Sequence, residues 1–188
     1  HHPELRRALE EGVWPDEEPP PRALIQDGGI PQPDRVRIRA WAEVTDRTRR
    51  LAAVLAGAGI GLRLDPAAAV APWESPHDHV ALYLHNGHEY LEGMLGAWKA
   101  RAASVNVNYR YVAAELRYVL ADSGARAVDY HGAFAATLAE VVGDLPDLAL
   151  LLQVDAGSGA PLLPGAVRYE DALAAASPRR YRNARPAN

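Results

Sequence analysis

The sequence contains no cysteine, a single methionine and a single phenylalanine among its 188 residues. The absence of cysteine excludes disulfides and thiolate metal sites and is consistent with a reducing compartment, so we predict a cytoplasmic protein. No stretch approaches the roughly 20 apolar residues that span a bilayer, which predicts no transmembrane segment and no secretory signal. The formal net charge of −4 is too small and too spread out to favour a nucleic acid or an anionic membrane as partner.

The first 40 residues differ in composition from the rest of the chain. Seven of the 15 prolines lie in residues 1–37, including the run from Pro19 to Pro21. Because proline cannot donate a backbone hydrogen bond, we predict that residues 1–40 form a mostly irregular lead, in which a short helix over Glu4–Glu11 is possible. The chain begins with His1 and its methionine is Met94, so we expect the natural start to lie upstream. Residues 177–188 are polar and are predicted to be a disordered tail.

Helical spacing begins at Trp41, and three glycines follow it. The apolar side of this predicted helix carries Val44, Thr48, Leu51, Leu55 and Ala58. Gly57, Gly59 and Gly61 resemble a dinucleotide-binding loop, but such a loop follows a strand and opens a helix, whereas this one follows a helix. We therefore interpret the glycines as a helix stop, and residues 62–75 as an atypical inserted loop.

From residue 79 onward, short apolar segments alternate with segments of helical spacing. The apolar segments predict strands over residues 79–84, 103–107, 127–130 and 148–154, with a weak strand at 166–169. Helices are predicted over 90–98, 113–121, 134–142 and 170–176. Such alternation is typical of an α/β fold, in which a parallel sheet carries helices on both faces.

Metal binding and nucleophilic catalysis find little support in the residue patterns. The histidine pairs 77/79 and 85/88 match no strong metal-binding template, and we expect no nearby carboxylate pair to complete a site. Ser158 lies outside any Gly-x-Ser-x-Gly motif and is interpreted as a turn residue. We therefore predict no metal site and no catalytic residue within this chain.

Polar and aromatic residues follow two of the predicted strands. Asn86 comes after the strand at 79–84, and the end of the strand at 103–107 is followed by a second group, Asn106, Asn108, Tyr109 and Arg110. Parallel sheets bind ligands beyond the carboxyl ends of their strands, so these residues are candidates for the border of a substrate or nucleotide pocket. The alternative is that they only hydrogen-bond the loops and cap the next helix.

Two segments carry a resemblance to a known family. Residues 78–90 (DHVALYLHNGHEY) and 98–111 (WKARAASVNVNYRY) resemble the adenylate-forming, AMP-binding acyl-CoA synthetases, and in particular their fatty-acyl branch. Residues 41–61 are similar to an early helix of this family, although Ala40 stands where a capping threonine is usual. The insertion at 62–75 and the segment 15–40 do not look like the family's pattern.

The resemblance implies that residues 41–176 are the first part of the large domain of an acyl-CoA synthetase. Such an enzyme uses ATP and Mg²⁺ to convert a fatty or other carboxylic acid into an acyl-adenylate, and then transfers the acyl group to CoA. The family's phosphate-binding loop and catalytic lysine would follow residue 176, so this chain is expected to be inactive and to bind no ligand tightly by itself. The alternative is a free-standing, non-catalytic α/β domain that binds a ligand or a partner.

Overall fold

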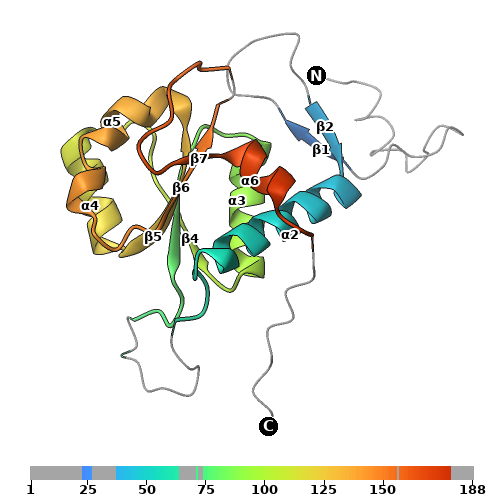
Figure 1. Cartoon of the computed structure of the whole chain (residues 1–188), viewed down its shortest axis with the longest axis horizontal. Helices are drawn as coiled ribbons and strands as arrows, with labels where there is room; N and C mark the ends of the chain where they lie inside the picture. The colour runs from blue at the N-terminus through green and yellow to red at the C-terminus, as the bar shows by residue number, and fades with distance from the viewer. Residues whose placement is uncertain (1–22, 27–36, 64–70, 72–73, 156, 179–188) are drawn as a thin grey trace, which may run out of the picture.

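The computed structural model describes residues 23–26, 37–63, 71, 74–155 and 157–178, and these include a five-stranded parallel sheet (Figure 1). Its strands are β3 (His79–Tyr83), β4 (Ala103–Asn106), β5 (Ala125–His131), β6 (Leu150–Val154) and β7 (Val167–Arg168). They lie in the order β4-β3-β5-β6-β7, and each neighbouring pair is parallel. All five strands therefore end at one side of the sheet, which we call the carboxyl edge.

Helices cover both faces of this sheet (Figure 1). One face carries α2 (Trp41–Gly57), α3 (His88–Lys99) and α6 (Tyr169–Ala175). The opposite face carries α4 (Ala113–Asp122) and α5 (Ala135–Ala139), with the short 3-10 turns η1 (Gly132–Phe134) and η2 (Val142–Asp144) on either side of α5. The predicted α/β fold with helices on both faces of a parallel sheet is confirmed.

Each face of the sheet has its own apolar core. Ala127 of β5 packs with the core under α2, α3 and α6, whereas its neighbour Val128 packs with the core under α4 and α5. This alternation follows from the geometry of a strand, in which successive side chains point to opposite faces. Full burial of a leucine such as Leu82 or Leu120 contributes about 1.5–3 kcal/mol, so both cores stabilise the fold.

Two predicted elements differ from the observed ones. The strand predicted at 127–130 extends over residues 125–131 as β5, and all but two of its side chains are buried. The single helix predicted at 134–142 is instead divided into η1, α5 and η2. Ala135, Leu138 and Val141 are buried at every third position across this segment, a spacing that 3-10 turns satisfy as well as an α-helix does.

The prediction of an irregular lead is wrong for two segments within residues 1–40. Strands β1 (Ala23–Gln26) and β2 (Arg37–Ala40) form an antiparallel pair in which Ala23 lies opposite Ala40. Neither strand contains a proline. The prediction rested on the proline content of the whole lead, and it therefore missed two short segments that can pair. The possible helix at 4–11 and most of the predicted tail at 177–188 lie outside the described residues.

The inserted loop at 62–75 is closed at its base. Leu62 forms an antiparallel bridge with His77, and the amide of Arg63 donates to the carbonyl of Pro76 at 2.8 Å. Residues 64–70 and 72–73 lie outside the described part of the chain. Among the described helices, none combines the length and the apolar character required to cross a bilayer.

Candidate functional site at the carboxyl edge

The register of the sheet brings four loops together at the carboxyl edge. Leu82 of β3 pairs with Asn106 of β4, Tyr83 pairs with Tyr130 of β5, and Tyr130 pairs with Gln153 of β6. Because these strands end at nearly the same level, the segments that follow them border one surface. This surface is where the sequence predicts a pocket border.

A cluster of rings occupies this edge and joins the loops after β3, β4 and β5. The ring of His85 lies 4.7 Å from that of Phe134, 4.9 Å from that of Tyr109 and 5.0 Å from that of His131, measured between centroids. Tyr109 and Phe134 are stacked at 5.9 Å. Of the cluster, the sequence singled out only Tyr109 for the pocket border. His85 was considered only as a possible metal ligand, and His131 and Phe134 join it only in the folded chain.

The predicted site residues after β4 share one exposed turn. The guanidinium of Arg110 lies over the ring of Tyr109 at 5.5 Å, and Asn108 Oδ1 accepts a hydrogen bond of 3.0 Å from the Arg110 amide. Asn108 thus hydrogen-bonds its own loop, which is the alternative to ligand binding that the sequence left open for these residues. Asn106, Asn108, Tyr109 and Arg110 are all exposed, so their unused polar groups can meet a ligand.

Neither helix that follows these turns is capped by an asparagine. Asn86 is exposed beyond β3, and α3 begins after Gly87 without a side-chain cap. At the start of α4, Glu115 accepts a hydrogen bond of 3.1 Å from the amide of Val112. The structure therefore brings Tyr109 and Arg110 into contact with the ring cluster, whereas Asn86 and Asn106 lie exposed at the ends of β3 and β4.

The loop after β6 packs closely against the loop after β5. A Cβ atom on Gly132 would lie 2.2 Å from Ser158 Oγ, so a larger residue at this position would force Ser158 to move. Ser158 Oγ donates to Asp155 Oδ1 at 2.9 Å, and the Gly159 amide donates to the same oxygen at 3.1 Å. These bonds close a tight turn, which confirms the interpretation of Ser158 as a turn residue.

The surroundings of His131 favour its neutral imidazole. Partial burial lowers the pKa of His131, the neighbouring His85 lowers it further, and Asp155 opposes both effects. His131 Nδ1 accepts a hydrogen bond of 3.1 Å from the Ala133 amide, which also requires that nitrogen to be unprotonated. The edge therefore offers an aromatic, weakly charged wall with one exposed guanidinium, a combination suited to a planar or apolar group that carries a negative charge.

A network of charged side chains lies on the face covered by α2, α3 and α6. Arg47 of α2 donates to Glu92 of α3 at 2.7 and 3.0 Å and to Glu170 of α6 at 2.8 and 2.6 Å. The Tyr169 hydroxyl donates to Glu92 Oε2 at 3.0 Å. Burial lowers the pKa of Arg47, but its bonds to Glu170 and Glu92 outweigh burial and raise the pKa above its ordinary value.

Asp129 of β5 points into the same face and is fully buried. Neither carboxyl oxygen has a hydrogen-bond partner among the described residues. A Cβ atom on Gly93 would lie 3.2 Å from Asp129 Oδ2, so α3 passes close above this carboxyl. Burial raises the pKa of Asp129 to about 7, since an isolated carboxylate is poorly solvated in the core.

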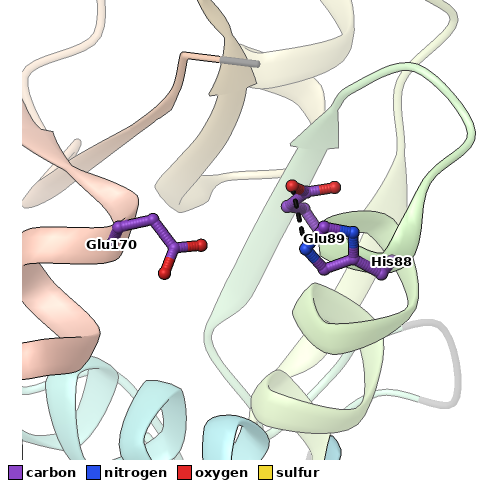
Figure 2. Close-up of side chains that lie close together, drawn as sticks. All are labelled: His88, Glu89 and Glu170. Carbon is purple, nitrogen blue, oxygen red and sulfur yellow. Dashed lines mark ion pairs between the residues drawn. The ribbon is translucent and has the colours of Figure 1, made fainter. Parts of the chain in front are cut away.

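Glu170 of this network also lies near two further side chains, His88 and Glu89, at the amino ends of two helices (Figure 2). His88 and Glu89 begin α3, Glu170 lies in the first turn of α6, and their ligand atoms are within 4.8 Å of one another. The residue patterns predicted that no carboxylate pair completes a metal site with the histidines; the structure places two carboxylates beside His88, and the absence of a metal site stays a prediction. Glu170 lies 82 positions after His88, so no local motif could have disclosed the group.

The single lysine of the sequence lies away from the carboxyl edge. Lys99 is the last residue of α3, and its ammonium donates to the hydroxyl of Thr48 in α2. Because α3 starts at the carboxyl edge, its last residue lies toward the opposite edge. Lys99 is therefore poorly placed to contact a ligand held by the ring cluster.

Comparison with known proteins gives a consistent result. The family model described as AMP-binding enzyme matches residues 15–184. The medium-chain acyl-CoA ligase Mig of Mycobacterium avium is 46% identical over 158 residues, which are 84% of this chain and 27% of that protein. A medium/long-chain-fatty-acid and 3-oxocholest-4-en-26-oate CoA ligase of Mycobacterium tuberculosis is 34% identical over 155 residues, which are 79% of this chain and 26% of that protein.

Solved structures share the fold. An acyl-CoA synthetase from Brucella canis superposes with a TM-score of 0.62 at 24% identity, covering 78% of this chain and 24% of that one. The chain thus spans about a quarter of the length of the curated relatives that it matches. The family match begins at residue 15, so it includes segments 15–40 and 62–75, which do not look like the family's pattern in the sequence.

Proposed function

The chain belongs to the AMP-binding enzyme family, and from this membership we propose that it is part of an ATP-dependent acyl-CoA ligase. In the proposed reaction a carboxylate oxygen attacks the α-phosphorus of ATP, which releases pyrophosphate and forms an acyl-adenylate. The thiol of CoA then attacks the acyl carbon, which releases AMP. Mg²⁺ would accompany ATP and neutralise charge on its phosphates.

The observation that carries this proposal is the 46% identity to a medium-chain acyl-CoA ligase over most of the chain. We accordingly propose a medium-chain fatty acid as the carboxylate substrate and the cytoplasm as the location. Residues 41–176 would be part of the AMP-binding domain, preceded by the lead at 1–40 and followed by the tail at 177–188. The insertion at 62–75 would be a local variation of this domain.

At the level of residues, we propose that the carboxyl edge borders the pocket of the ligase. Tyr109, stacked on Phe134, supplies an apolar wall, and Arg110 supplies a cation for a phosphate or carboxylate. Asn86, Asn106 and Asn108 would offer amides to the same ligand. The exposure of these residues supports this arrangement, because a pocket border must be accessible to substrate.

The 188 residues alone are proposed to be inactive. They contain no Ser/Thr/Gly-rich phosphate loop with a lysine, and their one lysine, Lys99, is bonded to Thr48. Adenylyl transfer depends on positioning and on charge stabilisation, so a chain that lacks the phosphate clamp should give no measurable pyrophosphate exchange. Exchange of labelled pyrophosphate into ATP by the purified chain with octanoate would contradict this part of the proposal.

A chimera tests whether this chain can serve as part of a ligase. The segment of the Mycobacterium avium ligase that aligns with this chain is replaced by the corresponding residues of this chain, and octanoyl-CoA formation is measured. We expect activity in the chimera and a clear loss in its Arg110→Ala variant, while Arg117→Ala, which removes an exposed arginine of α4, leaves activity unchanged. A folded but inactive chimera would instead favour the free-standing binding domain.

A further inference from the structure

Two parallel β-α units bring the amino ends of α3 and α6 to the same edge of the sheet. α3 follows β3, α6 follows β7, and both strands end at the carboxyl edge. His88 and Glu89 of α3 therefore meet Glu170 of α6 although they are far apart in the sequence. Figure 2 shows the Glu170 carboxylate pointing toward the other two side chains across the space between the helices.

We propose that His88, Glu89 and Glu170 form a binding site for a divalent transition-metal ion, with Zn²⁺ as its representative. His88 Nε2 and Glu89 Oε1 lie 3.0 Å apart. If an ion bonded to both atoms at about 2.0–2.2 Å, the angle between the two bonds at the ion would be about 90°. Such ions accept this angle with small adjustment. The site is separate from the ring cluster and does not depend on the proposed ligase activity.

The three proposed donors differ in exposure, so that two are held in place and one can move. The side chain of His88 is 5% exposed and that of Glu89 is 17% exposed, so two donors are held by packing. Glu170 is 61% exposed, and its side chain can rotate to shorten the separation of up to 4.8 Å without disturbing the core. The two fixed donors would position the ion, and Glu170 would close on it.

Arg47 competes with the proposed ion for the carboxylate of Glu170. Its guanidinium engages both oxygens of Glu170 and both oxygens of Glu92. Each carboxylate oxygen has two lone pairs, so Glu170 can keep a bond to Arg47 while it contributes a second lone pair to the ion. Arg47 then acts as an outer partner that orients a metal-bound carboxylate, a common arrangement around metal sites.

The donor set favours particular ions. One imidazole nitrogen with two carboxylates suits Zn²⁺ or Mn²⁺ better than Mg²⁺, which prefers an all-oxygen octahedron and retains its water. The site is therefore expected to select against the Mg²⁺ that accompanies ATP. Bound metal would link the start of α6 to the start of α3, and the stability of this contact would depend on the ion.

The test uses titration calorimetry of the 188-residue chain with ZnCl₂ and, separately, MgCl₂. Glu89→Gln and Glu170→Gln each remove one proposed donor. Asp171→Asn is the matched control, because it removes the same charge from an exposed residue beside Glu170 in the first turn of α6. Since the chain has seven histidines, binding alone is insufficient, and only the pattern across the variants assigns the site.

We expect one Zn²⁺ per chain in the original protein and in the Asp171→Asn variant, and weak binding of Mg²⁺. Loss of either glutamate should weaken Zn²⁺ binding by about tenfold or more. Equal binding in all four proteins, or no Zn²⁺ binding in any of them, would overturn the proposal.

A thermal measurement separates metal binding from a structural role of Glu170. The rise in Tm on adding Zn²⁺ is recorded relative to each variant's own metal-free Tm, so any loss of the Arg47–Glu170 ion pair cancels. The rise is expected in the original chain and in Asp171→Asn and is expected to be much smaller in Glu170→Gln. An undiminished rise in Glu170→Gln would show that the ion binds elsewhere.

Discussion

The two faces of the sheet are stabilised by different chemistry. Under α2, α3 and α6, the apolar core contains a charged network of Arg47, Glu92 and Tyr169, together with the buried carboxyl of Asp129. Under α4 and α5 the corresponding polar pair is neutral, because Tyr130 donates to Gln153 at 2.7 Å. We call the face under α2, α3 and α6 the charged face and the face under α4 and α5 the apolar face. The stability of the charged face should respond strongly to pH and to loss of a charge, whereas that of the apolar face should depend mainly on buried apolar area.

Buried charge is accepted in this fold where it joins helices to one another. A buried ion pair costs desolvation of both partners and contributes little net stability, yet removal of one partner leaves the other charge poorly solvated. Arg47 bonds to glutamates from both α3 and α6, so the network specifies how these helices dock on α2. Among the described residues, the face under α4 and α5 has no such charged network. The docking of its helices relies on how their apolar side chains fit together.

The largest expected effect is that of Arg47→Ala. This change removes the guanidinium that pairs with Glu92, whose side chain is fully buried, so we expect the free energy of unfolding to fall by about 3–5 kcal/mol. Chemical denaturation monitored by circular dichroism measures the change. A loss below about 1 kcal/mol would mean that the charged face is no more sensitive than the exposed surface.

Asp129→Asn should change the pH dependence of stability. Because burial raises the pKa from 3.8 to about 7, the native chain holds this proton more tightly than the unfolded chain, and its contribution is fully present below pH 3.8 and lost as pH rises through 7. The stability of the original chain relative to Asp129→Asn should therefore fall by on the order of 4 kcal/mol between pH 4 and pH 7. Denaturation at several pH values, with exposed Asp122→Asn as control, tests this sign; parallel profiles would contradict it.

A smaller effect is expected on the apolar face from Tyr130→Phe. The substitution keeps the ring but removes the donor to Gln153 Oε1, which lies in a buried side chain, so we expect a loss of about 1–3 kcal/mol. Since this pair is neutral, the loss should be the same at pH 5 and pH 8. A strongly pH-dependent loss would undermine the distinction between the two faces.

The smallest effect is expected from Arg117→Ala. Arg117 pairs with Asp144 at 2.8 Å, but the two side chains are 47% and 59% exposed, so solvent and salt screen the interaction. We expect a change of about 0–1 kcal/mol in the free energy of unfolding. Together with Arg47→Ala, this measurement compares a buried with an exposed arginine–carboxylate pair, and equal losses would refute the comparison.

Much of the fold was predictable because its signals are local. The apolar runs before His85 and Asp155 predict strands, and the helical spacing from Val44 predicts α2, because period and burial are written in consecutive residues. The hairpin of β1 and β2 was missed, since its strands are short and lie in a proline-rich lead. The division of the predicted helix around α5 was missed, because burial at every third position from Ala135 to Val141 is compatible with an α-helix and with 3-10 turns alike.

The residues of the candidate sites were predictable only in part. Asn108, Tyr109 and Arg110 were identified from their position after a strand, and their roles at a pocket border remain a prediction. His85 and Phe134 could not be identified as ring partners of Tyr109, because they come from different loops. Such contacts depend on which strands are neighbours, a property that no local pattern encodes.

By itself, the sequence determined the class of fold, the parallel arrangement of the strands and the family, since these depend on periodicity and on local motifs. Only the tertiary structure decided that Glu170 lies beside His88, that Arg47 bridges two helices and that Asp129 is buried without a hydrogen-bond partner among the described residues. The physical reason is that the first two features join residues 45 or more positions apart, and the third depends on which elements cover β5. Their free energies depend on solvent exclusion, which exists only once the helices have docked on the sheet.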